Sequence, residues 1–210
     1  MLKLIQKAQQ ALKVTAETKT EQALCGQAIL SVRDVAGLKQ LLEMKADVNA
    51  ADEQGNALSH AIDYVDSAQF AAEPEIGELV RALVEAKCDV NHTNAYGRSV
   101  ISKAHCSEVV ELLLDLDANP DLPQPGGAPT LLDHHIKDYL GSKPWNQDVY
   151  GGHEWGLLDT DAQLRIIKAL LRRGHRPQDQ FTFNKLLKKL SSDSELHALA
   201  SEKGRIPASD

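Results

Sequence analysis

The sequence predicts an all-α protein, a solenoid of about four helix–turn–helix repeats closed by a helical cap at each end. Two observations carry this prediction. Four segments resemble one another, at residues 37–58, 78–100, 108–132 and 163–179. Each begins with apolar residues spaced three and four apart, which places these residues on one face of a helix.

A polar link follows each apolar helix, and its geometry recurs. In three segments an Asn or Asp precedes a glycine by six residues: Asn49 and Gly55, Asn91 and Gly97, and Asp121 and Gly127. Glycine accepts a positive φ, so we expect a turn there before the next helix. The predicted single domain, residues 1–210, has an N-terminal helix at 1–19 and repeats at 20–50, 51–92, 93–122 and 123–179. A helical cap follows at 180–210, with Lys185, Lys188 and Lys189 facing water.

These links resemble the ankyrin repeat, whose period is about 33 residues. The segments ADVNAADEQG (46–55) and CDVNHTNAYG (88–97) look like its hallmark turn, and residues 33–49 are similar to its second helix and turn. The TPLH tetrapeptide of the family reads as ALSH at 57–60, SVIS at 99–102 and PTLL at 129–132. The resemblance implies a binding scaffold without chemistry of its own, and a structural role for His60.

Two long insertions interrupt the period, at residues 63–77 and 141–161. Both fall between the first and second helices of a repeat, so we expect them along one edge of the solenoid. The longer insertion holds Trp145, Tyr150 and Trp155, and the shorter one holds Tyr64 and Phe70. These rings either anchor a partner, as Trp and Tyr often do, or pack as satellite clusters under the loops. The candidate partner-binding residues are these five aromatics together with Asp148 and Glu154.

Charge is unevenly distributed along the chain. The whole chain has 30 acidic and 23 basic residues, a net charge of −7 with neutral His, which argues against a general nucleic-acid binder. Residues 108–161 contain eleven acids and two bases, a net charge of −9, whereas residues 162–210 contain ten bases and five acids, a net charge of +5. An acidic middle attracts a partner with a basic surface, although acids also keep repeat arrays soluble.

The cysteines and the apolar segments indicate the compartment. Cys25, Cys88 and Cys106 are an odd set without a CxxC spacing, which is typical of small buried side chains in a reducing compartment. No apolar run is long enough to span a membrane, and the lysine-interrupted N-terminus does not resemble a secretory signal. We therefore expect a cytoplasmic protein with no membrane partner.

No catalytic motif is recognisable. The chain has no GxSxG elbow, Walker loop or GxGxxG fingerprint. The pair His134 and His135, with His153 farther along, is the one metal-ligand alternative. Adjacent residues on a helix point about 100° apart, so the two do not readily share an ion. We expect no enzyme, no metal and no cofactor.

The predicted function is a non-enzymatic module that captures one protein partner, for example as an inhibitor or an immunity protein that neutralises a toxin. Two alternatives stay open at this point. One is a metal-dependent hydrolase that uses the cluster of His134, His135 and His153, and the other is a self-associating structural subunit.

Overall fold

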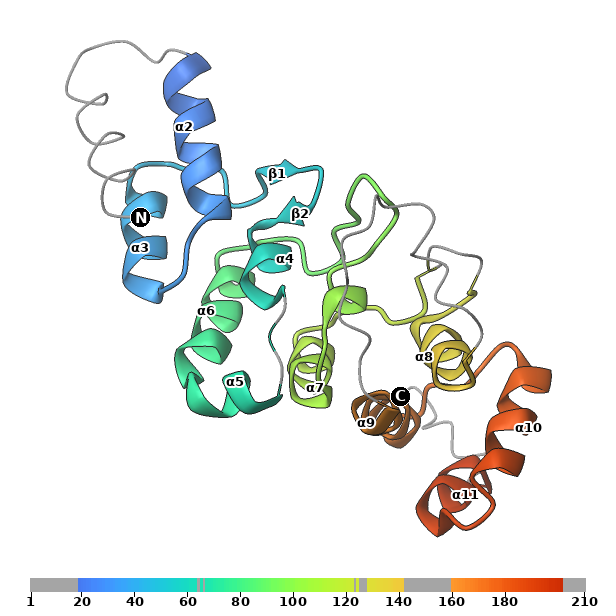
Figure 1. Ribbon diagram of the computed structural model, residues 1–210. Coiled ribbons are helices and arrows are strands. Elements are labelled where there is room, and N and C mark those ends of the chain that lie inside the picture. The colour runs from blue at the N-terminus through green and yellow to red at the C-terminus, as the bar shows by residue number, and fades with distance from the viewer. Residues whose placement is uncertain are drawn as a thin grey trace, which may run out of the picture. The chain divides into compact units, whose positions relative to one another are not determined.

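The computed structural model describes residues 19–63, 65, 67–122, 124, 128–141 and 160–201. Within these ranges the regular structure is almost entirely helical, which confirms the all-α class (Figure 1). No helix in these ranges is both long and apolar enough to cross a membrane. The chain forms two compact units, residues 1–119 and 120–210. The predicted helix at 1–19, except Lys19, and most of the insertion at 141–161 lie outside the described residues.

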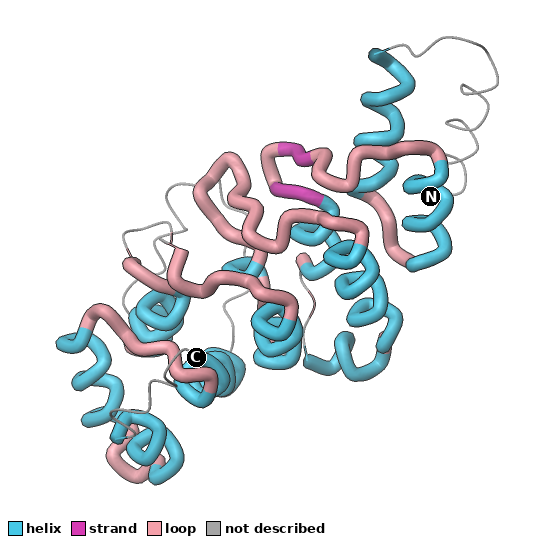
Figure 2. Tube along the Cα trace, turned by 180° about the vertical axis from the view of Figure 1, so that it is seen from behind, coloured by secondary structure: helices cyan, strands magenta, loops and turns pink. Residues whose placement is uncertain are grey.

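The first unit contains most of the helices. Its elements are α2 (Lys19–Leu30), α3 (Val35–Glu43), β1 (Ala51–Asp52), β2 (Gly55–Asn56), α4 (Ala57–Ile62), α5 (Ser67–Ala72), α6 (Pro74–Glu85), the 3-10 helix η1 (Ile101–Lys103) and α7 (Ser107–Asp115). Helix α2 packs on α3 and α4, while α6 packs on α3, α4 and α5. The apolar stripes that the sequence predicts are buried, with Leu38, Leu41, Leu83 and Leu113 at most 1% exposed. Figure 2 shows the loops of this unit along one side of α4, α6 and α7.

The second unit contains α8 (Leu131–Tyr139), α9 (Thr160–Arg172), α10 (Gln180–Lys189) and α11 (Ser194–Ser201). Helix α8 packs on α9 and α10, and α11 packs on α9. Its core is aliphatic apart from Phe183, and its largest buried side chains include Leu132, Ile136, Ile167 and Leu186.

Four helices end in the same way. The residue after the last turn adopts a left-handed conformation, with φ of 58° at Lys45, 72° at Lys87, 64° at Asp117 and 87° at Gly174. The N–H of each donates to the carbonyl three residues earlier, and the next N–H donates to the carbonyl five residues before itself. This is the Schellman motif, in which glycine is usual because a left-handed residue with a Cβ is strained by about 1 kcal/mol. Three of the four positions are not glycine, so packing and hydrogen bonds outweigh that strain.

Two helices are capped by side chains at or beside the predicted tetrapeptides. Asn56 caps α4 and accepts from the Ser59 N–H at 3.1 Å, and Thr130 caps α8 and accepts from the Asp133 N–H at 3.2 Å. The capping residue thus lies one position before the segment 57–60 in the first unit and is the second residue of the segment 129–132 in the second unit.

The apolar segment after Gly97 does not form the short α-helix that the sequence predicts. It forms only η1, because α7 already begins at Ser107 and the interval between Gly97 and Gly127 is 30 residues, about three short of one period. Helix α6, by contrast, begins at Pro74, earlier than the expected segment at 78–100, since proline is well suited to the first helical position.

The extended links carry short antiparallel pairings that the sequence did not predict as strands. Ala51 pairs with Asn56 and Asp52 with Gly55, and isolated bridges join Thr93 to Ser99 and Gln124 to Ala128. The positive φ expected of the turn glycines is confirmed at Gly55 and Gly97, with values of 131° and 75°. Gly127 lies outside the described residues.

Two glycine-to-alanine substitutions are expected to change stability in opposite directions. Gly55 has a φ of 131°, and a Cβ there would lie 2.7 Å from Ser59 Cβ, so Gly55→Ala should lower the free energy of unfolding by about 2 kcal/mol or more. Gly77 lies within α6, and its Cβ would lie 3.5 Å from Phe70 Cζ, an ordinary contact. Gly77→Ala should raise the free energy of unfolding by about 0.5–1 kcal/mol. Urea denaturation measures both, and shifts of equal sign would contradict this account.

Candidate protein-binding surface

Consecutive turns of the first unit are joined by two asparagine side chains. Asn49 Nδ2 donates to the Lys87 carbonyl at 3.0 Å, and Asn49 Oδ1 accepts from the Asp89 N–H at 2.7 Å. Asn91 repeats this one turn later, donating to the Asp117 carbonyl at 3.3 Å and accepting from the Asn119 N–H at 2.7 Å. We call the turns 45–56, 87–98 and 117–119, joined in this way, the turn row.

The turn row exposes acidic side chains on a rigid backbone. Asp47 and Asp89 each accept the N–H of the residue two positions on, at 2.9 Å, which holds both loops in tight turns. Asp52, Glu53 and Asp117 are exposed as well. The turn row therefore presents five exposed carboxylates, accompanied by the exposed Lys45 and Lys87 at the helix ends.

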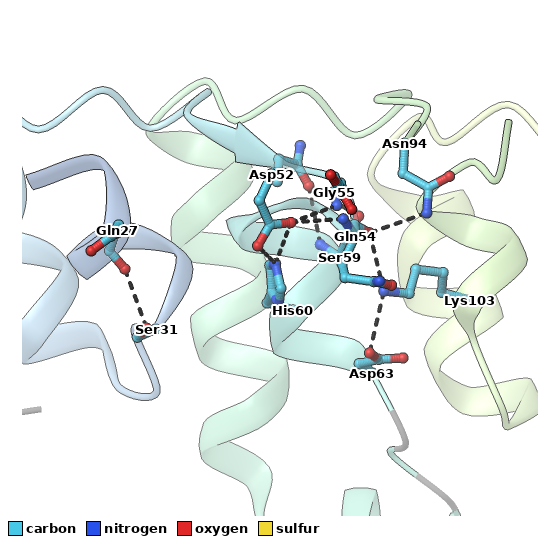
Figure 3. A network of polar contacts seen from close by, with 12 residues as sticks. Gln27, Ser31, Asp52, Gln54, Gly55, Ser59, His60, Asp63, Asn94 and Lys103 are labelled. Carbon is cyan, nitrogen blue, oxygen red and sulfur yellow. Dashed lines mark hydrogen bonds and ion pairs between the residues drawn. The ribbon is translucent and has the colours of Figure 1, made fainter. Parts of the chain in front are cut away.

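Asp52 is the centre of a small network under the first turn (Figure 3). Its carboxylate accepts from the Gln54 and Gly55 N–H groups at 2.8 and 3.0 Å and lies 3.0 Å from His60 Nε2. Partial burial raises the pKa of Asp52, but the hydrogen bonds from His60 and the Gln54 amide outweigh burial, so this pKa lies below its ordinary value. The network stabilises the hairpin of β1 and β2.

Lys103 is a buried cation that connects three segments of the first unit. Its side chain is 1% exposed, and Nζ donates to the Gln54 carbonyl and to Asp63 Oδ2, both at 3.3 Å (Figure 3). Burial lowers the pKa of Lys103, and the adjacent Asp63 only partly offsets this. Asn94 Nδ2 donates to the same Gln54 carbonyl at 3.2 Å. Because Lys103 has no access to solvent, it connects these segments structurally and is not available as a nucleophile.

The three cysteines are buried, as the sequence predicts. Burial, together with the nearby carboxylates of Asp89 and Asp47, raises the pKa of the Cys88 thiol to about 11. A thiol with so high a pKa carries almost no thiolate at neutral pH, so Cys88 is unreactive.

Among the candidate partner-binding residues, only Phe70 lies within the described part of the chain. It is half-buried on α5, with its ring against Gly77 of α6. Its predicted role in partner binding therefore stays a prediction. The other candidates, Tyr64, Trp145, Asp148, Tyr150, Glu154 and Trp155, lie outside the described residues.

The histidine pair of α8 does not form a recognisable metal centre with its described neighbours. The rings of His134 and His135 lie 5.6 Å apart at an angle of 59°, and His134 Nε2 is 3.4 Å from Asp138 Oδ2. Among the described residues no three His, Cys, Asp or Glu side chains are grouped so that they could hold an ion. His153, the third member of the predicted cluster, lies outside those residues.

The solvent face of α10 carries the basic residues that the sequence predicts to face water. Lys185, Lys188 and Lys189 are all exposed, which confirms that prediction. Phe181 precedes them and is 70% exposed, the one exposed large apolar side chain among the described residues. Sequence reasoning missed Phe181, although its spacing of four from Lys185 already placed it on the polar stripe.

Replacing Lys103 is expected to destabilise the first unit. Lys103→Met removes the donor of the Asp63 carboxylate and the Gln54 carbonyl, at a cost of about 2 kcal/mol in the free energy of unfolding. Lys39→Met, at an exposed position of α3, should change stability by less than about 0.5 kcal/mol. Equal urea midpoints for Lys103→Met and wild type would contradict the role of Lys103 in connecting the three segments.

The contribution of Asp52 to stability is expected to depend on pH. Because its pKa is lower in the folded chain than the ordinary 3.8, the unfolded chain takes up the proton first as pH falls. The stabilisation is thus present above that value and is lost as pH falls through the folded pKa. Unfolding of wild type and Asp52→Asn in urea, from about pH 6 to about pH 3, should give a difference that shrinks toward low pH. The exposed Glu85→Gln on α6 is the control, and a difference independent of pH would refute the prediction.

Two comparisons with known proteins give no match. No model of a protein family matches the chain. A search of curated proteins gives no significant match. The function must therefore be inferred from the contacts and charges described above.

Proposed function

We propose that this protein is a non-enzymatic protein-binding module built from ankyrin-like repeats. The single observation that carries the proposal is the turn row, in which Asn49 and Asn91 make the same pair of hydrogen bonds to the next turn. The shared Schellman ends at Lys45, Lys87 and Asp117 support it further. Such recurrence is expected of stacked repeats, each of which contacts mainly its neighbours.

A row of rigid turns suits the recognition of a folded partner. Stacked repeats create an extended surface, and the hydrogen bonds of the turn row hold its loops before any partner arrives. A pre-ordered surface loses less conformational entropy when it binds. The carboxylates of Asp47, Asp52 and Asp89 accept N–H groups of their own turns and are exposed as well, so they both fix the turns and remain accessible.

The chemistry of the turn row favours a partner with a basic surface. Asp47, Asp52, Glu53, Asp89 and Asp117 are exposed there, in a chain whose net charge is −7. Such a field accelerates encounter with a cationic protein and excludes anionic ones, including nucleic acids. An inhibitor or immunity protein that blocks a basic toxin is the specific form of this proposal. The odd number of cysteines and the burial of Cys25, Cys88 and Cys106 are consistent with action in the cytoplasm.

Capture experiments on tagged protein from native lysate test the proposed function. We expect wild type to retain one basic protein, identified by mass spectrometry. Against that purified partner, Glu53→Lys should slow association about tenfold at low salt, because it reverses an exposed charge of the turn row. Trp145→Ala with Trp155→Ala should cost about 2 kcal/mol or more of binding free energy if these rings are anchors.

Controls separate binding from folding. Lys39→Met and Glu85→Gln, exposed on α3 and α6, should bind as wild type does. Thermal unfolding of every variant checks that the chain is intact. If no partner is retained and the purified protein carries stoichiometric metal, the binding proposal fails and the metal-dependent hydrolase takes its place.

A further inference from the structure

Helix α10 presents an exposed stripe on the side opposite its buried residues. Phe183 and Leu186 are buried, whereas Phe181, Lys185 and Lys188 are exposed. The spacings of four and three place these three side chains on one face of the helix. We call Phe181, Lys185, Lys188 and the adjacent Lys189 the α10 face.

The charges of the α10 face are not neutralised by the described part of the second unit. Helix α10 itself contains no acidic residue. Lys185 Nζ lies 4.3 Å from the centre of the Phe181 ring, and Lys189 Nζ lies 4.9 Å from the centre of the Tyr139 ring. The nearby acids Asp193 and Glu195 pair with α9 instead, through Lys168 and Arg172. An aromatic ring beside lysines is therefore left facing solvent.

A surface of opposite charge lies in the first unit, where α5 meets α6. Glu73, Glu75 and Glu78 are exposed, and no ion pair to a described residue involves them. The small apolar residues Ala71, Ala72 and Pro74 are exposed between and before them. We call residues 71–75 and Glu78 the α5–α6 corner, and they belong to or border the shorter insertion of the sequence.

We propose that the α10 face of one copy docks on the α5–α6 corner of a second copy of this chain. Three lysines and a phenylalanine meet three glutamates and three small apolar residues. Lys185 and Lys188 are three positions apart on one helix, as Glu75 and Glu78 are on the other, so the two pairs have the same separation of about 5–6 Å. The Phe181 ring covers the exposed alanines and proline, while the lysines at its edge reach the carboxylates.

The composition of the α10 face fits a contact with a second copy of the chain better than it fits the solvent-exposed end of a repeat array. The free side of a last repeat is normally polar throughout, which keeps it soluble, and Phe181 departs from that pattern. The two docking surfaces differ, so the contact is heterologous, head to tail, and leaves one unused surface at each end. This inference is independent of the proposed function, since it uses neither the turn row nor a foreign partner.

Sedimentation of the purified full-length chain tests the inference without any ligand. At about 50 mM salt the average mass should rise with concentration and pass that of a dimer, and at about 0.5 M salt it should return to the monomer, because the ion pairs are screened. Lys185→Glu with Lys188→Glu should weaken association at least about tenfold, as should Glu75→Lys with Glu78→Lys. Phe181→Ser should weaken it without changing its dependence on salt.

Mixing the two charge-reversed proteins is the sharpest arm of the experiment. The protein with Lys185→Glu and Lys188→Glu retains an intact α5–α6 corner. The protein with Glu75→Lys and Glu78→Lys retains an intact α10 face, so the mixture contains one functional pair of surfaces. Association should return on mixing, and it should stop at a one-to-one dimer because both remaining surfaces are altered. Lys39→Glu and Glu85→Lys, on α3 and at the far end of α6, are controls that should associate as wild type does.

Three results would overturn the inference. They are a monomer at every concentration at low salt, association unchanged by both charge reversals, and a mixture that does not regain association. Thermal unfolding confirms that each variant folds, and Glu75→Gln with Glu78→Gln replaces the lysine variant if the latter does not fold. Capture of a foreign partner from lysate is unaffected by these outcomes, so the failure of one proposal is distinguishable from the failure of the other.

Discussion

The first unit depends on how its turns satisfy their own backbone. Peptide groups in a loop need partners, and the turn row supplies them through amide side chains. An asparagine carries a donor and an acceptor on one planar group, so Asn49 serves both the Lys87 carbonyl and the Asp89 N–H. An aspartate at this position could only accept hydrogen bonds. A serine side chain is too short to reach both the carbonyl and the N–H of the next turn. Since Asn49 and Asn91 each join two consecutive turns, they also set the spacing at which the attached helices pack.

This constraint explains which parts of the fold were predictable from the sequence. The apolar stripes around Leu41, Leu83 and Leu113 and the turn glycines at 55 and 97 are periodic, local features, and the structure bears them out. A helix cap depends on one hydrogen bond, so the caps at Asn56 and Thr130 do not follow from the periodic pattern. The burial of Lys103 does not follow from pattern, because it depends on partners about 40–50 residues away in the chain.

The candidate surfaces were predictable to a lesser degree than the helices. Net charge and its uneven distribution are sums over the sequence. The exposed lysines of α10 agree with the basic C-terminal segment, whereas four of the five exposed carboxylates of the turn row precede the predicted acidic segment at 108–161. The exposure of an individual ring cannot be obtained from such a sum. Phe181 and Phe183 are two residues apart and chemically identical, yet one is 70% exposed and the other 4%. Their places on α10 distinguish them, because Phe181 lies on the polar stripe with Lys185 and Phe183 lies on the buried side with Leu186.

Because acidic and basic residues are concentrated at different surfaces, an approaching protein is attracted to some of these surfaces and repelled by others. A chain of net charge −7 repels its own copies at long range, and the basic C-terminal helices are where that repulsion is weakest. A second copy therefore approaches most readily with an acidic surface toward α10, while a cationic protein approaches the turn row. At physiological ionic strength the field decays over about 8 Å, so these preferences act only when surfaces are nearly in contact. Orientation is then decided by which side chains are exposed locally, and net charge contributes mainly to the rate of encounter.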